Sequence, residues 1–153
     1  MKRTAPKKIL VLGGTRHIIG LVKSIKLSGM SPIVVDNIVN SPAKFHADKS
    51  FNANLGDTDR LMEIIRCEKV EGIFTAFEDI NTWNAVALCK KADLPFYMTQ
   101  EQLGVMSNRD KFMEICKRFN IALILDNALE NPLEEASKMS WNFPVLIKSK
   151  KAG

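Results

Sequence analysis

Two adjacent glycines and a third one further on stand near the start of the chain. They form the pattern Gly13-Gly14-x-x-x-x-x-Gly20, directly after an unbroken apolar run at positions 9–12. Glycine lets a ligand approach the backbone closely, and backbone N–H groups at the start of a helix attract phosphate or carboxylate. The pattern therefore predicts that Gly13 and Gly14 contact an anionic ligand. The alternative is a tight strand-to-helix turn that binds nothing, and the G-x-G-x-x-G spacing of dinucleotide sites is absent.

Three polar side chains stand beside this turn or at the end of the next apolar run. Arg16 can clamp a carboxylate or a phosphate with paired N–H donors. His17 either donates a hydrogen bond to the ligand or caps the turn. Asp36 ends the apolar run at 31–36. There it either accepts from a ribose hydroxyl, as acidic residues do in dinucleotide-binding folds, or makes a loop hydrogen bond.

A pair of acidic residues follows a third apolar run, at 72–77. A carboxylate at the end of a strand can hold an amine or a sugar hydroxyl of a substrate. We expect Glu78 to contact substrate and Asp79 to cap the helix that follows.

Two cations mark the later part of the chain. Arg109 begins a predicted helix, and Lys148 ends the apolar run at 143–148. A lysine at the end of a buried strand is unusual unless its ammonium group reaches solvent or a partner. Two convergent cations suit a triphosphate, and the alternative is a pair of surface residues whose stems lie along apolar neighbours.

The elements that must position these residues follow from the apolar pattern. Short apolar runs suit strands buried on both faces of a parallel sheet, and the segments between them have helical periodicity. We expect strands at 9–12, 31–36, 49–53, 72–77 and 94–97 and helices at 18–28, 59–68 and 80–92. This alternation predicts an α/β fold with a doubly wound parallel sheet, similar to a Rossmann fold.

The pattern changes near Met106. Thr99 and Gln102 form a capping box that opens a short helix to position 105, and Asn108 precedes a helix at 109–119. Beyond it we expect a strand at 121–125, a helix at 132–139 and a strand at 143–148. We therefore predict two domains, 1–106 and 107–153.

The composition narrows the class of protein. The chain has 153 residues, 46% of them hydrophobic and 25% charged, with a net charge of +5, as in an ordinary globular domain. No basic run alternates with aromatic residues, which argues against nucleic acid as a partner. No apolar stretch approaches the roughly 20 residues of a membrane span. The cysteines are widely spaced and no C-x-x-C pair occurs, so we expect reduced thiols and a cytoplasmic location: Cys67, Cys89 and Cys116.

The motifs, taken in order, resemble the N-terminal part of ATP-grasp enzymes. The runs at 8–14, 33–36, 41–43 and 47–50 resemble the α/β domain that precedes the ATP-grasp domain. They are most like members similar to the carbamoyl-phosphate-synthase large chain, the formate-dependent glycinamide ribonucleotide transformylase and amino-acid ligases. The run at 108–112 resembles the motif that opens the ATP-grasp domain. The run at 143–148 resembles the strand whose lysine contacts ATP, although Ser149 stands where the family usually has proline.

The resemblance implies an ADP-forming carboxylate–amine ligase that uses ATP and Mg²⁺ and acts through an acyl phosphate. It implies that Arg109 and Lys148 bind ATP, with Lys111 as a second candidate. The substrates would be a small carboxylate and an amine. The residues that carry over to substrate binding are Gly13, Gly14, Arg16, His17 and Glu78.

The family's flap, adenine-binding hinge and magnesium ligands are expected beyond Gly153, so no metal ligand is predicted within the chain. We therefore expect a fragment that is inactive alone, whose uncovered apolar surface would favour a homodimer. The alternative is a non-catalytic α/β module that binds a nucleotide or small anion. A dinucleotide-dependent oxidoreductase is a third interpretation.

Overall fold

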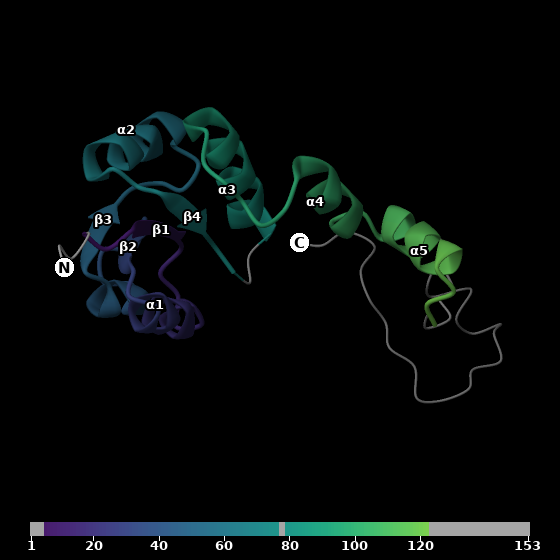
Figure 1. Ribbon diagram of the computed structural model, residues 1–153, viewed down its shortest axis with the longest axis horizontal. Helices are drawn as coiled ribbons and strands as arrows, with labels where there is room; N and C mark the ends of the chain where they lie inside the picture. Colours follow the sequence, from purple (N-terminus) through teal and green to yellow (C-terminus); the bar gives the residue numbers. More distant parts are fainter. Residues whose placement is uncertain (1–4, 77–78, 123–153) are drawn as a thin grey trace, which may run out of the picture. The chain divides into compact units, whose positions relative to one another are not determined.

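A computed structural model describes residues 5–76 and 79–122 of the chain. Its centre is a four-stranded sheet in the order β3-β2-β1-β4 (Figure 1). All adjacent strands are parallel, which confirms the predicted α/β class. The strands are β1 (Lys8–Leu12), β2 (Ser31–Asp36), β3 (Lys49–Asn52) and β4 (Gly72–Phe74).

Helices cover both faces of this sheet. Helix α1 (Ile18–Leu27) lies on one face, and α2 (Thr58–Glu68) and α3 (Asp79–Ala92) lie on the other (Figure 1). Successive residues of a strand point to opposite faces, so an unbroken apolar run fills both layers. In β1, for example, Val11 packs with α1, whereas Leu10 and Leu12 pack with α2 and α3. The sheet is therefore doubly wound, as predicted.

The ends of the helices follow the signals in the sequence. Gly29 stops α1 with a φ of +75°, a left-handed conformation that suits glycine, and the Met30 N–H donates to the Ile25 carbonyl at 3.2 Å. The Asp57 carboxylate caps α2 by accepting from the Arg60 N–H at 3.0 Å. These local interactions fix where each helix begins and ends.

The strand predicted at 94–97 is wrong, because these residues pair with none of the described strands. Pro95 lacks the N–H that a strand needs. The Phe96 and Tyr97 rings instead lie 4.1 Å apart between centroids, and the Tyr97 ring lies 4.9 Å from that of Phe74. Strand β4 also ends earlier than the predicted 72–77, at Phe74.

Two further helices follow, α4 (Gln100–Met106) and α5 (Arg109–Arg118). The predicted capping box is present: the Gln102 N–H donates to Thr99 Oγ1 at 3.1 Å, and the Thr99 N–H donates to Gln102 Oε1 at 2.8 Å. The chain forms two compact units, Met1–Ile115 and Cys116–Gly153. The assignment of 1–106 and 107–153 to two functional domains stays a prediction. None of the described helices is long and apolar enough to cross a membrane.

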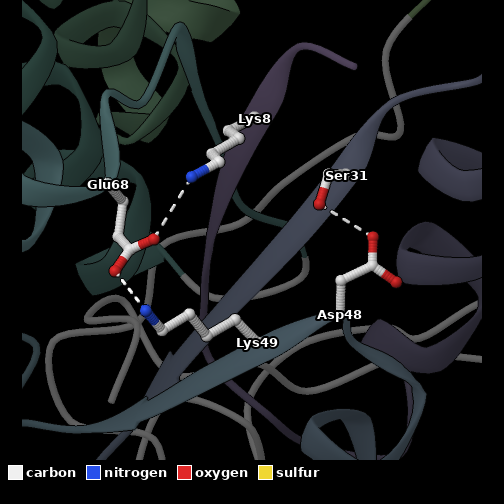
Figure 2. A network of polar contacts seen from close by, with 5 residues as sticks. All are labelled: Lys8, Ser31, Asp48, Lys49 and Glu68. Atoms are coloured by element: carbon white, nitrogen blue, oxygen red, sulfur yellow. Dashed lines mark hydrogen bonds and ion pairs between the residues drawn. The ribbon is translucent and has the colours of Figure 1, made fainter. Parts of the chain in front are cut away.

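Charged residues join the elements at the amino ends of the strands (Figure 2). Glu68, at the end of α2, pairs with Lys8 of β1 at 3.4 Å and with Lys49 of β3 at 2.5 Å. Nearby, the Ser31 hydroxyl donates to Asp48 at 2.8 Å. The two lysines lower the pKa of Glu68, Lys49 contributing most. We call these residues the amino-end network: Lys8, Ser31, Asp48, Lys49 and Glu68. It lies at the amino ends of the strands, whereas the glycine turn lies at their carboxyl ends.

Candidate functional site

The glycine turn follows β1 at the point where the strand order changes direction. The chain passes from β1 to β2 on one side and returns to β4 on the other side. In open α/β sheets, ligands bind outside the carboxyl ends of the strands at such a switch point. Residues 13–17 after β1 and residues 75–76 after β4 therefore face the expected ligand crevice.

The N–H groups of both glycines in the turn bind inside the protein. The Gly13 N–H donates to the Val35 carbonyl at 2.9 Å, and the Gly14 N–H donates to Asp36 Oδ2 at 2.5 Å. Gly13 has a φ of +96°, a conformation that strains any residue with a side chain. An anion at this turn would therefore be bound by groups from Thr15 onward rather than by these two N–H groups.

Gly14 is required for a second reason, which is space. A methyl group on Gly14 would lie 2.7 Å from Ser41 Cβ and 2.9 Å from Asp36 Oδ2, and closer still to Ser41 Oγ. Both glycines and Ser41 are buried. The segment after β2 thus packs directly on the turn after β1.

Asp36 makes a loop hydrogen bond, which decides between the two roles considered for it. Its Oδ1 accepts from the Ile38 N–H at 2.7 Å, and its Oδ2 accepts from Gly14. The side chain is buried, with 5% of its surface exposed. A ribose hydroxyl would have to compete with these backbone donors, so the geometry argues against the dinucleotide interpretation.

Lys44, in the 3₁₀ helix η1 (Pro42–His46), binds the segment around Asp36. Its ammonium group donates to the Asp36 carbonyl at 2.8 Å, to the Ile38 carbonyl at 2.6 Å and to Asn52 Oδ1 at 2.5 Å. Burial lowers the pKa of Lys44, and the nearby Asp36 charge partly opposes this effect. A buried lysine whose three donors are all satisfied is a structural cation.

The segment after β4 and helix α3 bring polar groups to the turn. Thr75 Oγ1 donates to the Leu12 carbonyl at 3.1 Å, and the Tyr97 hydroxyl donates to the Thr75 carbonyl at 3.2 Å. Burial raises the pKa of Tyr97. The buried Asn81 of α3 lies against the glycine turn, its Nδ2 at 3.2 Å from where a Gly13 Cβ would lie. These contacts hold β1, β4 and α3 together at the switch point.

The two predicted ligand-binding side chains of the turn are exposed. Arg16 and His17 lie at the surface, and His17 occupies the N-cap position of α1. Its side chain makes no capping hydrogen bond there, so of the two roles considered, the structure does not support capping. The structure thus brings Gly13, Gly14, Arg16 and His17 together in one turn at the switch point.

The remaining predicted site residues are placed only in part. Glu78 and Lys148 lie outside the described residues. Arg109 is the first residue of α5, and both it and Lys111 are exposed. Convergence of Arg109 and Lys148 on a triphosphate stays a prediction. Among residues 5–76 and 79–122, no group of three or more potential metal ligands occurs.

Sequence reasoning missed four residues around the turn. Their roles depend on contacts between segments far apart in the chain, and no periodicity or spacing marks them. For Ser41 the only signal is its place in the run at 41–43, and for Tyr97 it is that this is the only tyrosine in the chain. The residues are Ser41, Lys44, Asn52 and Tyr97.

Comparisons with known proteins show what the chain as a whole is similar to. No family model matches the chain. It is 26% identical over 159 residues to the carbamoyl phosphate synthase large chain of Clostridium botulinum (strain Langeland), covering 93% of this chain and 15% of that protein. It is 28% identical over 145 residues to the formate-dependent phosphoribosylglycinamide formyltransferase of Prochlorococcus marinus subsp. pastoris, covering 94% and 37%. The chain thus spans less than two-fifths of these relatives.

Solved structures share the fold. N5-carboxyaminoimidazole ribonucleotide synthetase from Thermotoga maritima has a TM-score of 0.70 at 21% identity, over 96% of this chain and 39% of that one. The Staphylococcus aureus N5-carboxyaminoimidazole synthetase, complexed with ADP, has a TM-score of 0.65 at 18% identity, over 86% and 35%.

The fold defines an α/β domain whose glycine turn lies at the switch point of its parallel sheet. The particular resemblance is to the N-terminal part of ATP-grasp enzymes, which confirms the family resemblance expected from the sequence.

Proposed function

We propose that this chain is the N-terminal portion of an ATP-dependent carboxylate–amine ligase. The support is the similarity to ligase relatives along 93–94% of the chain, together with the α/β fold those enzymes share. In such a reaction, a carboxylate oxygen attacks the γ-phosphorus of ATP, and ADP leaves. The amine then attacks the acyl carbon, phosphate leaves, and the amine loses a proton.

We assign the glycine turn to the substrate of this reaction. The observation that carries the assignment is the position of Arg16 and His17, both exposed on the turn at the switch point of the sheet. A guanidinium group there can pair with a phosphate or a carboxylate through two parallel hydrogen bonds. Glu78, which follows the run after β4, would hold an amine or a hydroxyl of the same substrate.

ATP would bind through the later part of the chain. Arg109 and Lys148 would neutralise the charge that builds up on the transferred phosphoryl group. Mg²⁺ would neutralise part of the same charge, and we assign no residue of this chain to hold it. Because the resemblance reaches only the start of the ATP-binding domain, we propose that the 153-residue chain binds substrate without turning over ATP by itself.

Substrate binding can be tested by calorimetric titration of the purified chain. The Prochlorococcus relative is named for a phosphoribosyl compound and for formate, so ribose 5-phosphate and formate are suitable probes. We expect ribose 5-phosphate to bind and Arg16→Ala to weaken binding by about tenfold, the loss of one charge-assisted contact.

The matched control is Lys23→Ala, which removes the same charge from an exposed position on α1. It should leave the affinity unchanged. Equal weakening by both variants would show that only net charge matters, and binding that survives Arg16→Ala intact would place the substrate elsewhere.

A further inference from the structure

We propose that Asp36 and Lys44 are positioning residues of the substrate turn. In this inference, Asp36 fixes the backbone at Gly14, and Lys44 fixes the segment that carries Asp36. The shape of the turn then depends on a loop that need not touch the ligand. The inference rests on the proposed function in one respect, namely that the turn binds substrate.

The Gly14 backbone is held from both sides, by the last residue of β2 and by a residue of η1. Its N–H donates to Asp36 Oδ2 at 2.5 Å, and its carbonyl accepts from the Ala43 N–H at 2.9 Å. Ser41 packs against the Gly14 Cα between these two contacts. A change in the loop therefore moves the start of the ligand turn.

The loop itself is held by the Lys44 ammonium group. This group joins the carbonyls of Asp36 and Ile38 to Asn52 of β3. Ile38 also donates its N–H to the Asp36 carboxylate, so residues 36–38 are fixed at several points. Removal of this buried cation is costly, because it leaves three acceptors without a donor.

The Asp36 carboxylate links two segments, because it accepts from the loop after β2 and from the turn after β1. The buried carboxylate uses one oxygen for its own loop and the other for Gly14. An aspartate that only ended β2 would need the first contact and not the second. The second contact sets the direction in which residues 15–17 leave the sheet.

The first test compares Asp36→Asn with Glu68→Gln. An asparagine offers one acceptor oxygen to two N–H donors, so its side chain cannot keep both the Gly14 and the Ile38 contact, while the volume is kept. Glu68→Gln breaks ion pairs of the amino-end network at the opposite edge of the sheet (Figure 2). It therefore controls for a general loss of stability.

The readouts are amide hydrogen exchange at Gly14, relative to Val34 in the sheet, and the affinity for ribose 5-phosphate under conditions where each variant is folded. We expect Asp36→Asn to speed the relative exchange at Gly14 by about tenfold to a hundredfold, as for the loss of a hydrogen bond to a charged group. We expect the affinity to fall by about tenfold, since binding must then order the turn. Glu68→Gln should change neither the exchange at Gly14 relative to Val34 nor the affinity for ribose 5-phosphate.

Lys44→Met provides a second variant that leaves the carboxylate in place. It should speed exchange at both Gly14 and Ile38 and weaken the affinity in the same direction. Native affinity in both Asp36→Asn and Lys44→Met, with faster exchange at Gly14, would overturn the positioning role.

Failure of the proposed function gives a different result. If the native chain binds no ribose 5-phosphate, the substrate assignment is lost, and the exchange data alone then judge the inference. Unchanged relative exchange at Gly14 in Asp36→Ala, which removes both acceptor oxygens, would show that this carboxylate does not fix the turn.

Discussion

Gly14→Ala is the most direct test of how closely the loop after β2 packs on the glycine turn. The added methyl group would lie 2.7 Å from Ser41 Cβ and 2.9 Å from Asp36 Oδ2, nearer than side-chain carbons approach these atoms. Asp36 ends β2 and Ser41 lies in the loop that follows, and hydrogen bonds hold the backbone of both residues, so relief requires a backbone shift. Overpacking of this kind costs about 1–3 kcal/mol, and we expect the upper half of that range.

The assay is urea unfolding of the purified chain, with thermal unfolding in parallel. A loss of about 2–3 kcal/mol should lower Tm by roughly 4–12 °C for a chain of this size. Gly20→Ala is the matched control, because a Cβ at Gly20, within α1, meets no atom within 4 Å. That substitution should raise the free energy of unfolding by about 0.5–1 kcal/mol.

A double substitution separates steric contact from other effects. Ser41→Gly removes the two nearest atoms, so it should recover part of the loss caused by Gly14→Ala, with a coupling energy of about 1–2 kcal/mol. The 2.9 Å approach to Asp36 would remain, and recovery should be incomplete. The reasoning is refuted if Gly14→Ala unfolds like the native chain, or if Ser41→Gly leaves the loss unchanged.

Three further predictions concern titrating groups. The contacts with Lys49 and Lys8 lower the pKa of Glu68 and stabilise the fold. This stabilisation is complete above the pKa of the carboxyl in the unfolded chain, about 4.3, and is lost as pH falls through its lower pKa in the folded chain. Urea unfolding of Glu68→Gln should therefore lose less free energy between neutral and acid pH than the native chain does. Cys67 is exposed, whereas burial raises the pKa of Cys89 to about 11, so a thiol reagent should modify Cys67 first and Cys89 only on unfolding; equal rates would contradict the packing of α3. Tyr97 is the only tyrosine, so phenolate absorbance reports it alone, and its titration midpoint should lie above 10 in the folded chain and fall on unfolding.

The sheet could be predicted because its strands are buried on both faces. The run at 31–36 has no polar residue between its ends, and such a run has few other stable settings. The capping box of Thr99 and Gln102 is a local signal, and the structure confirms it. The strand prediction for 94–97 was wrong, because a short apolar run that contains proline can equally pack beside a sheet without pairing with a strand.

The site was harder to predict than the fold. The sequence indicates that Arg16 and His17 lie in a turn after β1, because that inference needs only neighbouring residues. It could not show that Asp36 would bind the turn, since two roles fit its place equally well. Nor could it show that Lys44 is buried, because lysine is usually exposed and its three partners come from two different segments.

Mapping of amide signals by NMR tests the central claim most directly, namely that the glycine turn binds the substrate. Ribose 5-phosphate is added to the isotope-labelled chain, and the shifts of the backbone N–H signals are followed. We predict that the largest shifts occur at residues 13–17 and that they shrink in Arg16→Ala. Shifts confined to the amino ends of the strands, near Glu68, or no shift at saturating probe, would contradict the claim.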